Sequence, residues 1–292
     1  MHRTVHTPKL EIAYRESGPA DGPPVILMHG WPSDVHDWDD VAATLADGGW
    51  RVLVPWLRGF GPTRFLDPVT PRSGQQGALG ADLRDFMDAL GIEEAMLAGY
   101  DWGGRAACVV AALWPERVRA LVSMSYNIQN IRRNASPDEV AQEHRDWYQW
   151  YFNTERGRAG LTQNRRDLVR FLWRLWAPNW HFDDATFAAS AVSFDNPDFV
   201  AVTIHSYRHR YGNAPGDPAF DEIEQRLAAQ PPITVPTIVL ECLADGVGPP
   251  SPFDHSASHF TNRYERRLIP LAGHFLPREA PQNVIGAIHD LS

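Results

Sequence analysis

Short apolar runs alternate with helical patterns along the first and last parts of this chain. Each apolar run is continuous rather than alternating, which is typical of strands buried on both faces of a parallel sheet. The strands are predicted at residues 24–28, 51–55, 95–99, 118–124, 237–243 and 264–268, and the helices at residues 79–90, 103–114 and 281–291. This alternation predicts an α/β protein whose mostly parallel sheet is covered by helices on both faces.

The middle of the chain, residues 130–230, lacks this alternation. It is rich in arginine, tryptophan and phenylalanine. Helices are predicted there at residues 138–151, 165–176 and 199–210. Because ligands bind at the carboxyl ends of the strands in open α/β sheets, a helical insertion between two strands is expected to cover the site as a lid. We therefore predict a core formed by residues 1–129 and 231–292, with a helical lid at residues 130–230.

Composition narrows the partners and the location that we expect. The net charge of −9 opposes binding to nucleic acid or to an anionic membrane surface, because both would repel an acidic protein. The longest apolar run, residues 106–114, is too short to span a bilayer. The chain starts with a polar segment, so no secretory signal is expected, and Cys108 and Cys242 have no metal-ligand spacing. We therefore expect a cytoplasmic protein with free thiols.

Asp101 stands at the most informative turn of the sequence. The strand predicted at residues 95–99 ends in Gly99 and the next helix opens at Gly103, within the run Gly-Tyr-Asp-Trp-Gly-Gly. Small residues on both sides allow a tight strand–turn–helix geometry that strains one residue and raises its side chain above the sheet. Such an elbow usually carries a serine nucleophile, whereas an aspartate in an arbitrary turn is more often a helix N-cap. The spacing and the place in the fold favour Asp101 as a carboxylate nucleophile.

Two further residues, His274 and Asp245, are predicted to act with Asp101, because such a nucleophile needs a base and a group that orients the base. His274 follows the last predicted strand, where a loop can bring an imidazole over the elbow. Asp245 follows the strand predicted at residues 237–243 within two residues. The end of the preceding strand offers no carboxylate, since none occurs between Arg119 and Ser136. An ordinary turn aspartate is the alternative for Asp245.

Backbone N–H groups are expected to form an oxyanion site beside the nucleophile. One belongs to Trp102, directly after Asp101, and the other to Trp31 in the run His-Gly-Trp-Pro after the strand at residues 24–28. These two runs, together with the chain order nucleophile, acid and histidine, resemble those of the α/β-hydrolase superfamily. The resemblance covers nearly the whole chain, and it implies the α/β-hydrolase fold with a helical lid inserted after the sixth strand.

An aspartate nucleophile restricts the reaction. A carboxylate that attacked an ester or an amide would form an anhydride, whereas displacement at a saturated carbon gives a covalent alkyl ester. His274 would then activate water to attack the carbonyl carbon of Asp101, and the oxyanion site would stabilise the tetrahedral intermediate. Two substrate classes fit this scheme, epoxides and alkyl halides, and neither requires a metal ion or an organic cofactor.

The leaving group separates the two classes, because an epoxide opens to an alkoxide that needs a proton donor whereas a halide needs only N–H donors. Residues 147–152 resemble the first lid-tyrosine motif of the α/β-hydrolase epoxide hydrolases, with Tyr148 at the catalytic position. Residues 206–208 resemble the second motif around Tyr207, with Ser206 in place of the usual tryptophan. An isolated tyrosine more often belongs to an aromatic core. Two tyrosines that each lie in the expected segment favour an epoxide hydrolase. Its tyrosines would hold and protonate the oxygen of a small apolar epoxide.

Two alternatives stay open. A haloalkane or haloacetate dehalogenase would use the same Asp101, and Arg105 is similar to the carboxylate-binding arginine of the haloacetate enzymes. Those enzymes usually carry a second arginine directly after the nucleophile, where this chain has Trp102. A lone arginine on the outside of a helix more commonly forms an ion pair. A binding or scaffold protein that kept the fold would show a degraded triad, and all three positions here hold competent residues.

Overall fold

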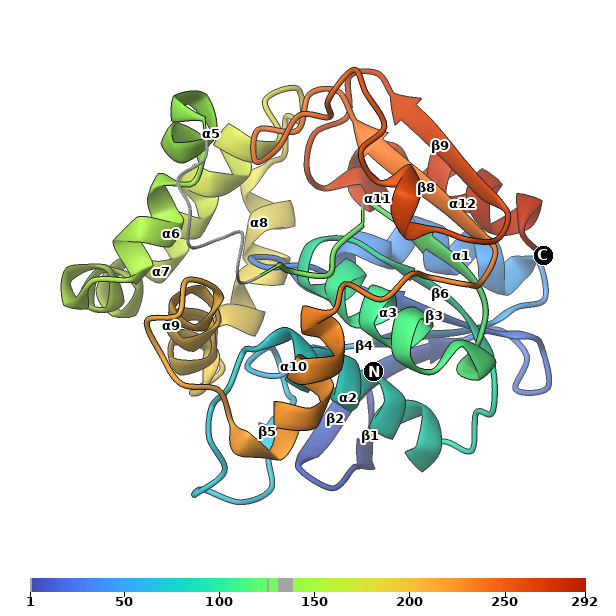
Figure 1. Cartoon of the computed structure of the whole chain (residues 1–292), viewed down its shortest axis with the longest axis horizontal. Coiled ribbons are helices and arrows are strands. Elements are labelled where there is room, and N and C mark those ends of the chain that lie inside the picture. Colours follow the sequence, from blue (N-terminus) through green and yellow to red (C-terminus); the bar gives the residue numbers. More distant parts are fainter. Residues whose placement is uncertain (1, 125, 131–138) are drawn as a thin grey trace.

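A sheet of nine strands, counted over the described residues, forms the centre of the computed structural model, which describes residues 2–124, 126–130 and 139–292 (Figure 1). The strands are β1 (Arg3–His6), β2 (Leu10–Ser17), β3 (Pro24–Met28), β4 (Arg51–Pro55), β5 (Arg64–Phe65), β6 (Ala95–Gly99), β7 (Val118–Ser123), β8 (Thr237–Cys242) and β9 (Tyr264–Ile269). They are ordered β1-β2-β4-β3-β6-β7-β8-β9, with β5 paired to β2. From β4 to β9 all neighbours pair in parallel, as predicted.

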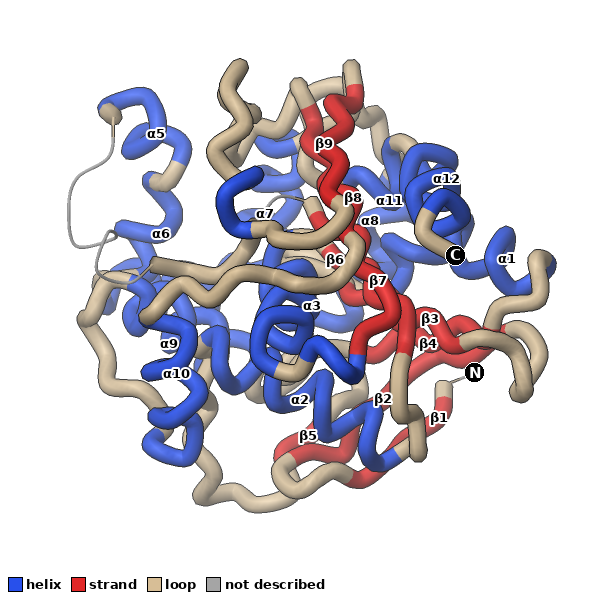
Figure 2. Tube along the Cα trace, turned by 45° about the vertical axis from the view of Figure 1, so that its right-hand side comes forward, coloured by secondary structure: helices blue, strands red, loops and turns tan. Residues whose placement is uncertain are grey.

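Helices lie on both faces of this sheet (Figure 2). The helices around it are α1 (Asp39–Asp47), α2 (Gln76–Ala89), α3 (Asp101–Leu113), α10 (Asp221–Ala228), α11 (Leu276–Glu279) and α12 (Pro281–Asp290). On one face α1 contacts α11 and α12, and on the other α2 contacts α3 and α10. The apolar strands are therefore enclosed from both sides, and every residue of β6 is buried.

The chain between β7 and β8 is helical, as predicted, but its helix boundaries differ in part. It contains α5 (Val140–Arg145), α6 (Trp147–Phe152), α7 (Glu155–Trp176), α8 (Asp184–Ala191) and α9 (Phe199–Arg210) ahead of α10, and α5, α6, α7 and α9 stand to one side of the sheet in Figure 1. Helix α9 has the predicted limits. Helix α7 starts ten residues before the predicted 165, where the Thr154 side chain caps it by accepting from the Gly157 N–H, and it is kinked at Asn164 (φ −124°, ψ 28°). The helix predicted at residues 165–176 is the part of α7 after this kink.

The single helix predicted at residues 138–151 is two helices, and its first residue lies outside the described part of the chain. Asp146 separates them, with φ −83° and ψ 8°. Its carboxylate accepts hydrogen bonds from the side chains of Gln142 and Gln149 at 3.2 and 2.7 Å. An aspartate held by neighbouring side chains competes with continuation of the helix. None of the helices within the described ranges combines the length and the apolar character that a membrane crossing needs.

The antiparallel edge formed by β1 and β2 was not predicted. Strand β2 mixes charged with apolar residues, so it lacks the continuous apolar run that marks the inner strands. It is nevertheless held by antiparallel pairing on both sides, to β1 and to β4. Backbone pairing with β1, its neighbour in the chain, and with the more distant β4, rather than an apolar pattern, makes this segment a strand.

Candidate active site

Asp101 occupies a strained turn between β6 and α3. Its φ of 47° lies in the left-handed region that non-glycine residues rarely adopt. The turn is closely packed on both sides. A Cβ on Gly99 would lie 2.7 Å from the backbone of Gly103, and one on Gly103 would lie 2.2 Å from the carbonyl oxygen of Met28. Glycine is therefore required at both positions for the turn that presents the Asp101 carboxylate at the carboxyl ends of the parallel strands.

The structure brings His274 and Asp245 to this turn. His274 lies in the loop between β9 and α11, and Asp245 follows β8. The Nδ1 atom of His274 is 3.0 Å from Oδ2 of Asp245, and its Nε2 atom is 3.9 Å from Oδ2 of Asp101. The Nε2 atom is buried and has no hydrogen-bond partner among the described residues. The imidazole thus has one nitrogen held by a carboxylate and the other directed at the nucleophile, with a separation that leaves space for a reacting group.

Glu279, which was not predicted as a site residue, positions the His274 loop. Its two carboxylate oxygens accept hydrogen bonds from the backbone N–H groups of Gly273 and Phe275, at 2.8 and 2.9 Å. The N–H of His274 itself donates to the carbonyl of Trp176 at 3.0 Å, at the end of α7. The loop is therefore held from the core and from the helices between β7 and β8. The glutamate five residues after the histidine was the available signal.

The charges around His274 favour its protonated form in the free protein. Burial alone would lower the pKa of His274. The charge and the hydrogen bond of Asp245 oppose this, as does the charge of Asp101, and together they raise the pKa to about 9. His274 is therefore an imidazolium at neutral pH in the free protein. Loss of that charge removes one of the causes that raise the pKa of His274.

Backbone donors approach the Asp101 carboxylate from two elements. The N–H of Trp31, in the loop after β3, donates to Oδ1 of Asp101 at 2.7 Å. Trp102 is the second residue of α3, and the first N–H groups of an α-helix have no partner within the helix. Gly30 allows the close approach of the β3 loop, because a Cβ at that position would lie 2.7 Å from the Cβ of Asp101. The predicted Trp31 donor thus contacts the Asp101 carboxylate directly, and the Trp102 N–H has no acceptor within its own helix.

Tyr148 on α6 and Tyr207 on α9 lie side by side within an aromatic cluster. Both are buried, their ring centroids are 5.5 Å apart, and the Trp31 indole stacks on Tyr148 at 5.8 Å. Burial raises the pKa of both phenols well above 10, so both keep their protons at neutral pH. Tyr148 lines the cavity above Asp101, whereas Tyr207 packs beside it against Phe152 and Trp102. Tyr148 is therefore the phenol with direct access to a bound molecule.

A side-chain relay, whose members were not predicted as site residues, holds the Tyr148 hydroxyl. The Nε2 atom of Gln149 donates to the Tyr148 oxygen at 3.1 Å and to Asp146 at 2.7 Å. Its Oε1 atom accepts from Arg210 at 2.7 Å and from the Tyr211 hydroxyl at 2.9 Å. These bonds fix which way the amide points, so the phenol oxygen is an acceptor here and its own proton is directed elsewhere. Gln149 lies within the motif quoted for Tyr148, and Arg210 has no comparable signal.

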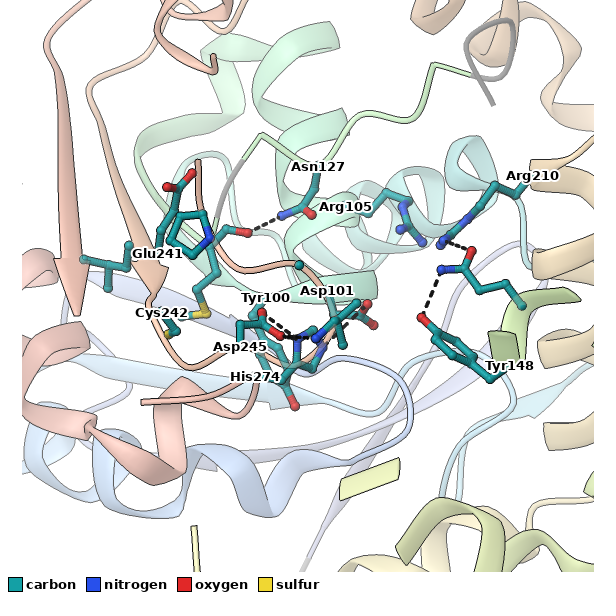
Figure 3. A pocket seen from close by; sticks show the side chains of 16 residues that line it. Tyr100, Asp101, Arg105, Asn127, Tyr148, Arg210, Glu241, Cys242, Asp245 and His274 are labelled. Atoms are coloured by element: carbon teal, nitrogen blue, oxygen red, sulfur yellow. Dashed lines mark hydrogen bonds and ion pairs between the residues drawn. The ribbon is translucent and has the colours of Figure 1, made fainter. Parts of the chain in front are cut away.

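These groups surround a cavity of about 230 Å³ (Figure 3). Asp101, His274 and Asp245 line one side, and Tyr148 lies across from them. Gln149, which donates to the Tyr148 oxygen, also lines the cavity. Across the described ranges, no group of three or more histidines, cysteines, aspartates or glutamates is placed to hold a metal ion. The arrangement combines a carboxylate, an imidazole paired with a second carboxylate, and a protonated phenol around one small volume.

Arg105 departs from the expected ion pair on the outside of a helix. It is 6% exposed on α3 and lines the cavity instead. Its Nε and one terminal nitrogen are buried and have no hydrogen-bond partner among the described residues. The interpretation failed because the outer side of α3 at this position is covered by other parts of the fold.

The chain matches the family described as alpha/beta hydrolase fold over residues 23–281. Its structure superposes with a TM-score of 0.97 on the crystal structure of "a putative epoxide hydrolase" from Klebsiella pneumoniae, which is 48% identical. That match covers 99% of this chain and 96% of the other.

Shorter matches connect the chain to two curated relatives. Epoxide hydrolase 2 from Siraitia grosvenorii is 34% identical over 135 residues, which are 46% of this chain and 41% of that protein. Haloalkane dehalogenase from Mycobacterium marinum is 37% identical over 120 residues, which are 40% of this chain and 38% of that protein. The matched segments thus span about two fifths of the length of these relatives.

Proposed function

This chain belongs to the α/β-hydrolase fold family, and within it we propose that the protein is an epoxide hydrolase, which adds water to an epoxide and releases a vicinal diol. One observation carries the proposal: a buried, protonated phenol, that of Tyr148, lines the same small cavity as the carboxylate of Asp101. The similarity over the whole chain to the Klebsiella protein supports the same activity. The two groups supply what epoxide opening needs, a nucleophile for carbon and a proton for oxygen.

The first step forms a covalent ester on Asp101. Its Oδ2 attacks an epoxide carbon, because Oδ1 is held by the Trp31 N–H at 2.7 Å. The carbon–oxygen bond of the ring breaks, and the resulting alkoxide takes the proton of Tyr148. The Gln149 amide, which donates to the phenol oxygen at 3.1 Å, stabilises the phenolate that this transfer leaves. Tyr207 packs against Tyr148 and assists from beside it.

Ester formation prepares the second step by changing the charge beside His274. The negative charge on Asp101 helps to raise the pKa of His274, and the ester carries no charge. The pKa of His274 therefore falls in the intermediate, which favours release of the imidazolium proton to solvent. The neutral imidazole can then accept a proton, and it takes one back from solvent once Asp101 carries its charge again. His274 takes one proton from water, and the water oxygen attacks the carbonyl carbon of Asp101.

The tetrahedral intermediate places its negative oxygen against the N–H groups of Trp31 and Trp102. Collapse breaks the bond to the product oxygen and regenerates the Asp101 carboxyl group. The two protons of the water, one on His274 and one on the new carboxyl group, return to the product alkoxide and to the Tyr148 phenolate. Atoms and protons then balance as one epoxide and one water giving one diol.

The alternative is a haloalkane or haloacetate dehalogenase, favoured by the segment similar to the Mycobacterium marinum enzyme. It would use the same ester and the same hydrolysis, but a departing halide takes no proton. A screen of aryl and aliphatic epoxides beside chloroalkanes, bromoalkanes and haloacetates distinguishes the two. We expect diol formation from epoxides, and halide release without diol formation would establish the alternative.

The tyrosine assignment is tested with Tyr148→Phe and with Tyr148→Phe combined with Tyr207→Phe. Loss of a general acid typically slows a reaction by about 10²- to 10⁴-fold, so kcat for an epoxide should fall by that factor. Tyr264→Phe is the matched control, since its hydroxyl contacts Asp254 outside the cavity. Unchanged diol formation in the double variant would refute the assignment.

The covalent step has a separate test. A single turnover is run in water that carries a heavy oxygen isotope, with protein in excess over epoxide. The heavy oxygen should appear in the carboxyl group of Asp101, because water attacks that carbon. Mass spectrometry of the peptide that contains Asp101 reads the result. Label found only in the diol would indicate direct attack of water on the epoxide.

A further inference from the structure

Asp37 is a buried carboxylate that the proposed reaction does not use. It lies on the short 3₁₀ helix Val35–Trp38, beyond the loop that follows β3, and it is 1% exposed. It is not among the described residues that line the cavity around Asp101. A buried carboxylate destabilises a fold unless ion pairs and hydrogen bonds compensate it. The partners of Asp37 therefore indicate what this carboxylate does.

Three donors from three separate segments converge on the Asp37 carboxylate. The hydroxyl of Ser33 and the Nε atom of Arg278 both donate to its Oδ1, each at 2.5 Å. The hydroxyl of Tyr100 donates to its Oδ2. Burial, and then the charge of Asp37, raises the pKa of Tyr100 well above 10, so the phenol keeps its proton and stays a donor. Both oxygens of Asp37 are therefore engaged.

Tyr100 connects Asp37 to the nucleophile and to the base. It directly precedes Asp101 in the chain, in the strained turn between β6 and α3. Its ring contacts the ring of His274 edge to face, with centroids 5.7 Å apart, and Tyr100, Asp101 and His274 lie close together in Figure 3. Because Asp37 holds the hydroxyl, the ring of Tyr100 is a fixed wall on one side of the imidazole.

Ser33 connects Asp37 to the loop that carries the oxyanion donor. It lies two residues after Trp31, whose N–H donates to the Asp101 carboxylate at 2.7 Å. The N–H of Ser33 also closes a turn on the carbonyl of Gly30 at 3.0 Å. The bond from Ser33 to Asp37 therefore holds the end of this loop and, through it, the position of the Trp31 N–H.

Arg278 connects Asp37 to the loop that carries the base. It lies on α11, four residues after His274. Its Nε donates to Asp37, and one of its terminal nitrogens donates to the Ser190 hydroxyl on α8 at 2.5 Å. The guanidinium is thus fixed from two sides, and it holds the start of α11 beside the short helix of Asp37. Displacement of Arg278 would be transmitted to His274 through only four residues.

Asp82 shows how this chain uses a buried carboxylate that serves the fold alone. It is 8% exposed on α2, and its two oxygens accept from Nε and a terminal nitrogen of Arg58, each at 2.6 Å. Neither residue is among the described residues that line the cavity around Asp101. Asp82 pairs with one side chain away from the proposed chemistry, whereas Asp37 joins the three segments that carry it.

We propose that Asp37 is a positioning residue, which holds these three segments in the geometry that hydrolysis of the Asp101 ester needs. Formation of the ester uses Asp101 and Tyr148, and Tyr148 stands on α6, which supplies none of the three donors. Hydrolysis uses His274, the Trp31 N–H and the carbonyl carbon of Asp101 at once, and these groups adjoin the three donors. The proposal rests on the proposed ester mechanism, and it holds whether an epoxide or a halide forms the ester.

Asp37→Asn tests the role, because the amide keeps the size of the side chain and loses its charge and one acceptor. Ester hydrolysis in a single turnover should slow by about 10- to 100-fold, as small misplacements of reacting groups do, and ester formation should slow much less. The ester then accumulates, so kcat and KM should fall together. Mass spectrometry of intact protein quenched during turnover should show a larger fraction carrying the mass of the substrate than in wild type. A lower kcat with an unchanged KM and no added ester would overturn the proposal.

Asp82→Asn is the matched control, because it breaks a buried ion pair away from the cavity. Its Tm should fall, but its esterified fraction should equal that of wild type. Tyr100→Phe removes a single hydroxyl and should show a weaker form of the Asp37→Asn effect. The double variant should slow hydrolysis by less than the product of the two single effects, because the two groups share one bond. Accumulation of ester in Asp82→Asn, or independent effects of Asp37 and Tyr100, would contradict the proposal.

A measurement without substrate allows the positioning role and the proposed function to fail separately. The NMR signal of the His274 Nδ1 proton, which faces Asp245, should shift in Asp37→Asn and stay in place in Asp82→Asn. An unchanged signal in Asp37→Asn, together with normal ester hydrolysis, would refute the positioning role and leave the function standing. A shifted signal in a protein whose wild type forms no ester would refute the function and leave the link from Asp37 to His274 standing. Should Asp37→Asn fail to fold, Tyr100→Phe and Ser33→Ala provide the same tests, since each removes one donor and keeps the carboxylate.

Discussion

The titration of His274 predicts a pH-dependent part of the protein's stability. The pKa of His274 is raised from 6.5 to about 9, with burial opposed by the charges of Asp245 and Asp101. Because the pKa is higher in the folded protein, this contribution is fully present below about pH 6.5 and is lost as the pH rises through 9. The difference between the two pKa values corresponds to about 3 kcal/mol of unfolding free energy. The side chain is 9% exposed, so solvent screening is small.

Urea unfolding of wild type and His274→Gln, followed by tryptophan fluorescence from about pH 6 to about pH 9.5, measures this contribution. The stability advantage of wild type over His274→Gln should shrink by about 3 kcal/mol across that range. In Asp245→Asn the loss should occur at lower pH, because the main group that raises the pKa of His274 is gone. His289→Gln, at an exposed histidine, should follow wild type. An advantage that is constant, or that grows with pH, would refute the charge assignment at His274.

Two further variants test the relay and the elbow. Gln149→Met removes the donor to Tyr148 and the acceptor of Arg210, so kcat for an epoxide should fall roughly tenfold; an unchanged kcat would contradict the relay. Gly103→Ala places a Cβ 2.2 Å from the last carbonyl oxygen of β3 and should lower the unfolding free energy by roughly 1–3 kcal/mol in urea titration. Gly286→Ala, which meets nothing within 4 Å in α12, is the control and should be neutral or stabilising, and equal stability of both variants would contradict the packing argument.

Charges of opposite sign line the cavity. Asp101 and Asp245 hold negative charge beside His274, and Arg105 and Arg210 contribute positive charge. The net charge of −9 describes the surface as a whole and gives no sign of this local reversal.

Local patterns in the sequence determined the inner strands and the elbow. Mostly apolar runs predicted β3, β4 and β6 to β8 nearly to the residue, because a strand buried on both faces has few polar positions. Strand β9, at the edge of the sheet, has the mixed sequence Tyr-Glu-Arg-Arg-Leu-Ile and is only partly buried. Asp101 could be identified because the strand before it and the helix after it constrain a turn of only a few residues. The chain order of Asp245 and His274 followed from the strands that precede them, and their contact at 3.0 Å is the geometry those positions predict. Their catalytic roles stay predictions.

Only the tertiary structure decided which polar groups share the cavity. Gln149 and Arg210 are far apart in the chain, and their hydrogen bond exists because α6 packs against α9. Arg105 has a helical position that is exposed in an isolated helix, and burial by distant segments leaves two of its nitrogens without a hydrogen-bond partner among the described residues. Strand β2 likewise depends on partners on both sides of it. The pattern and spacing of residues in the sequence indicate local conformation. Burial and charge pairing depend on every segment that packs nearby, and these contacts form only when the chain folds.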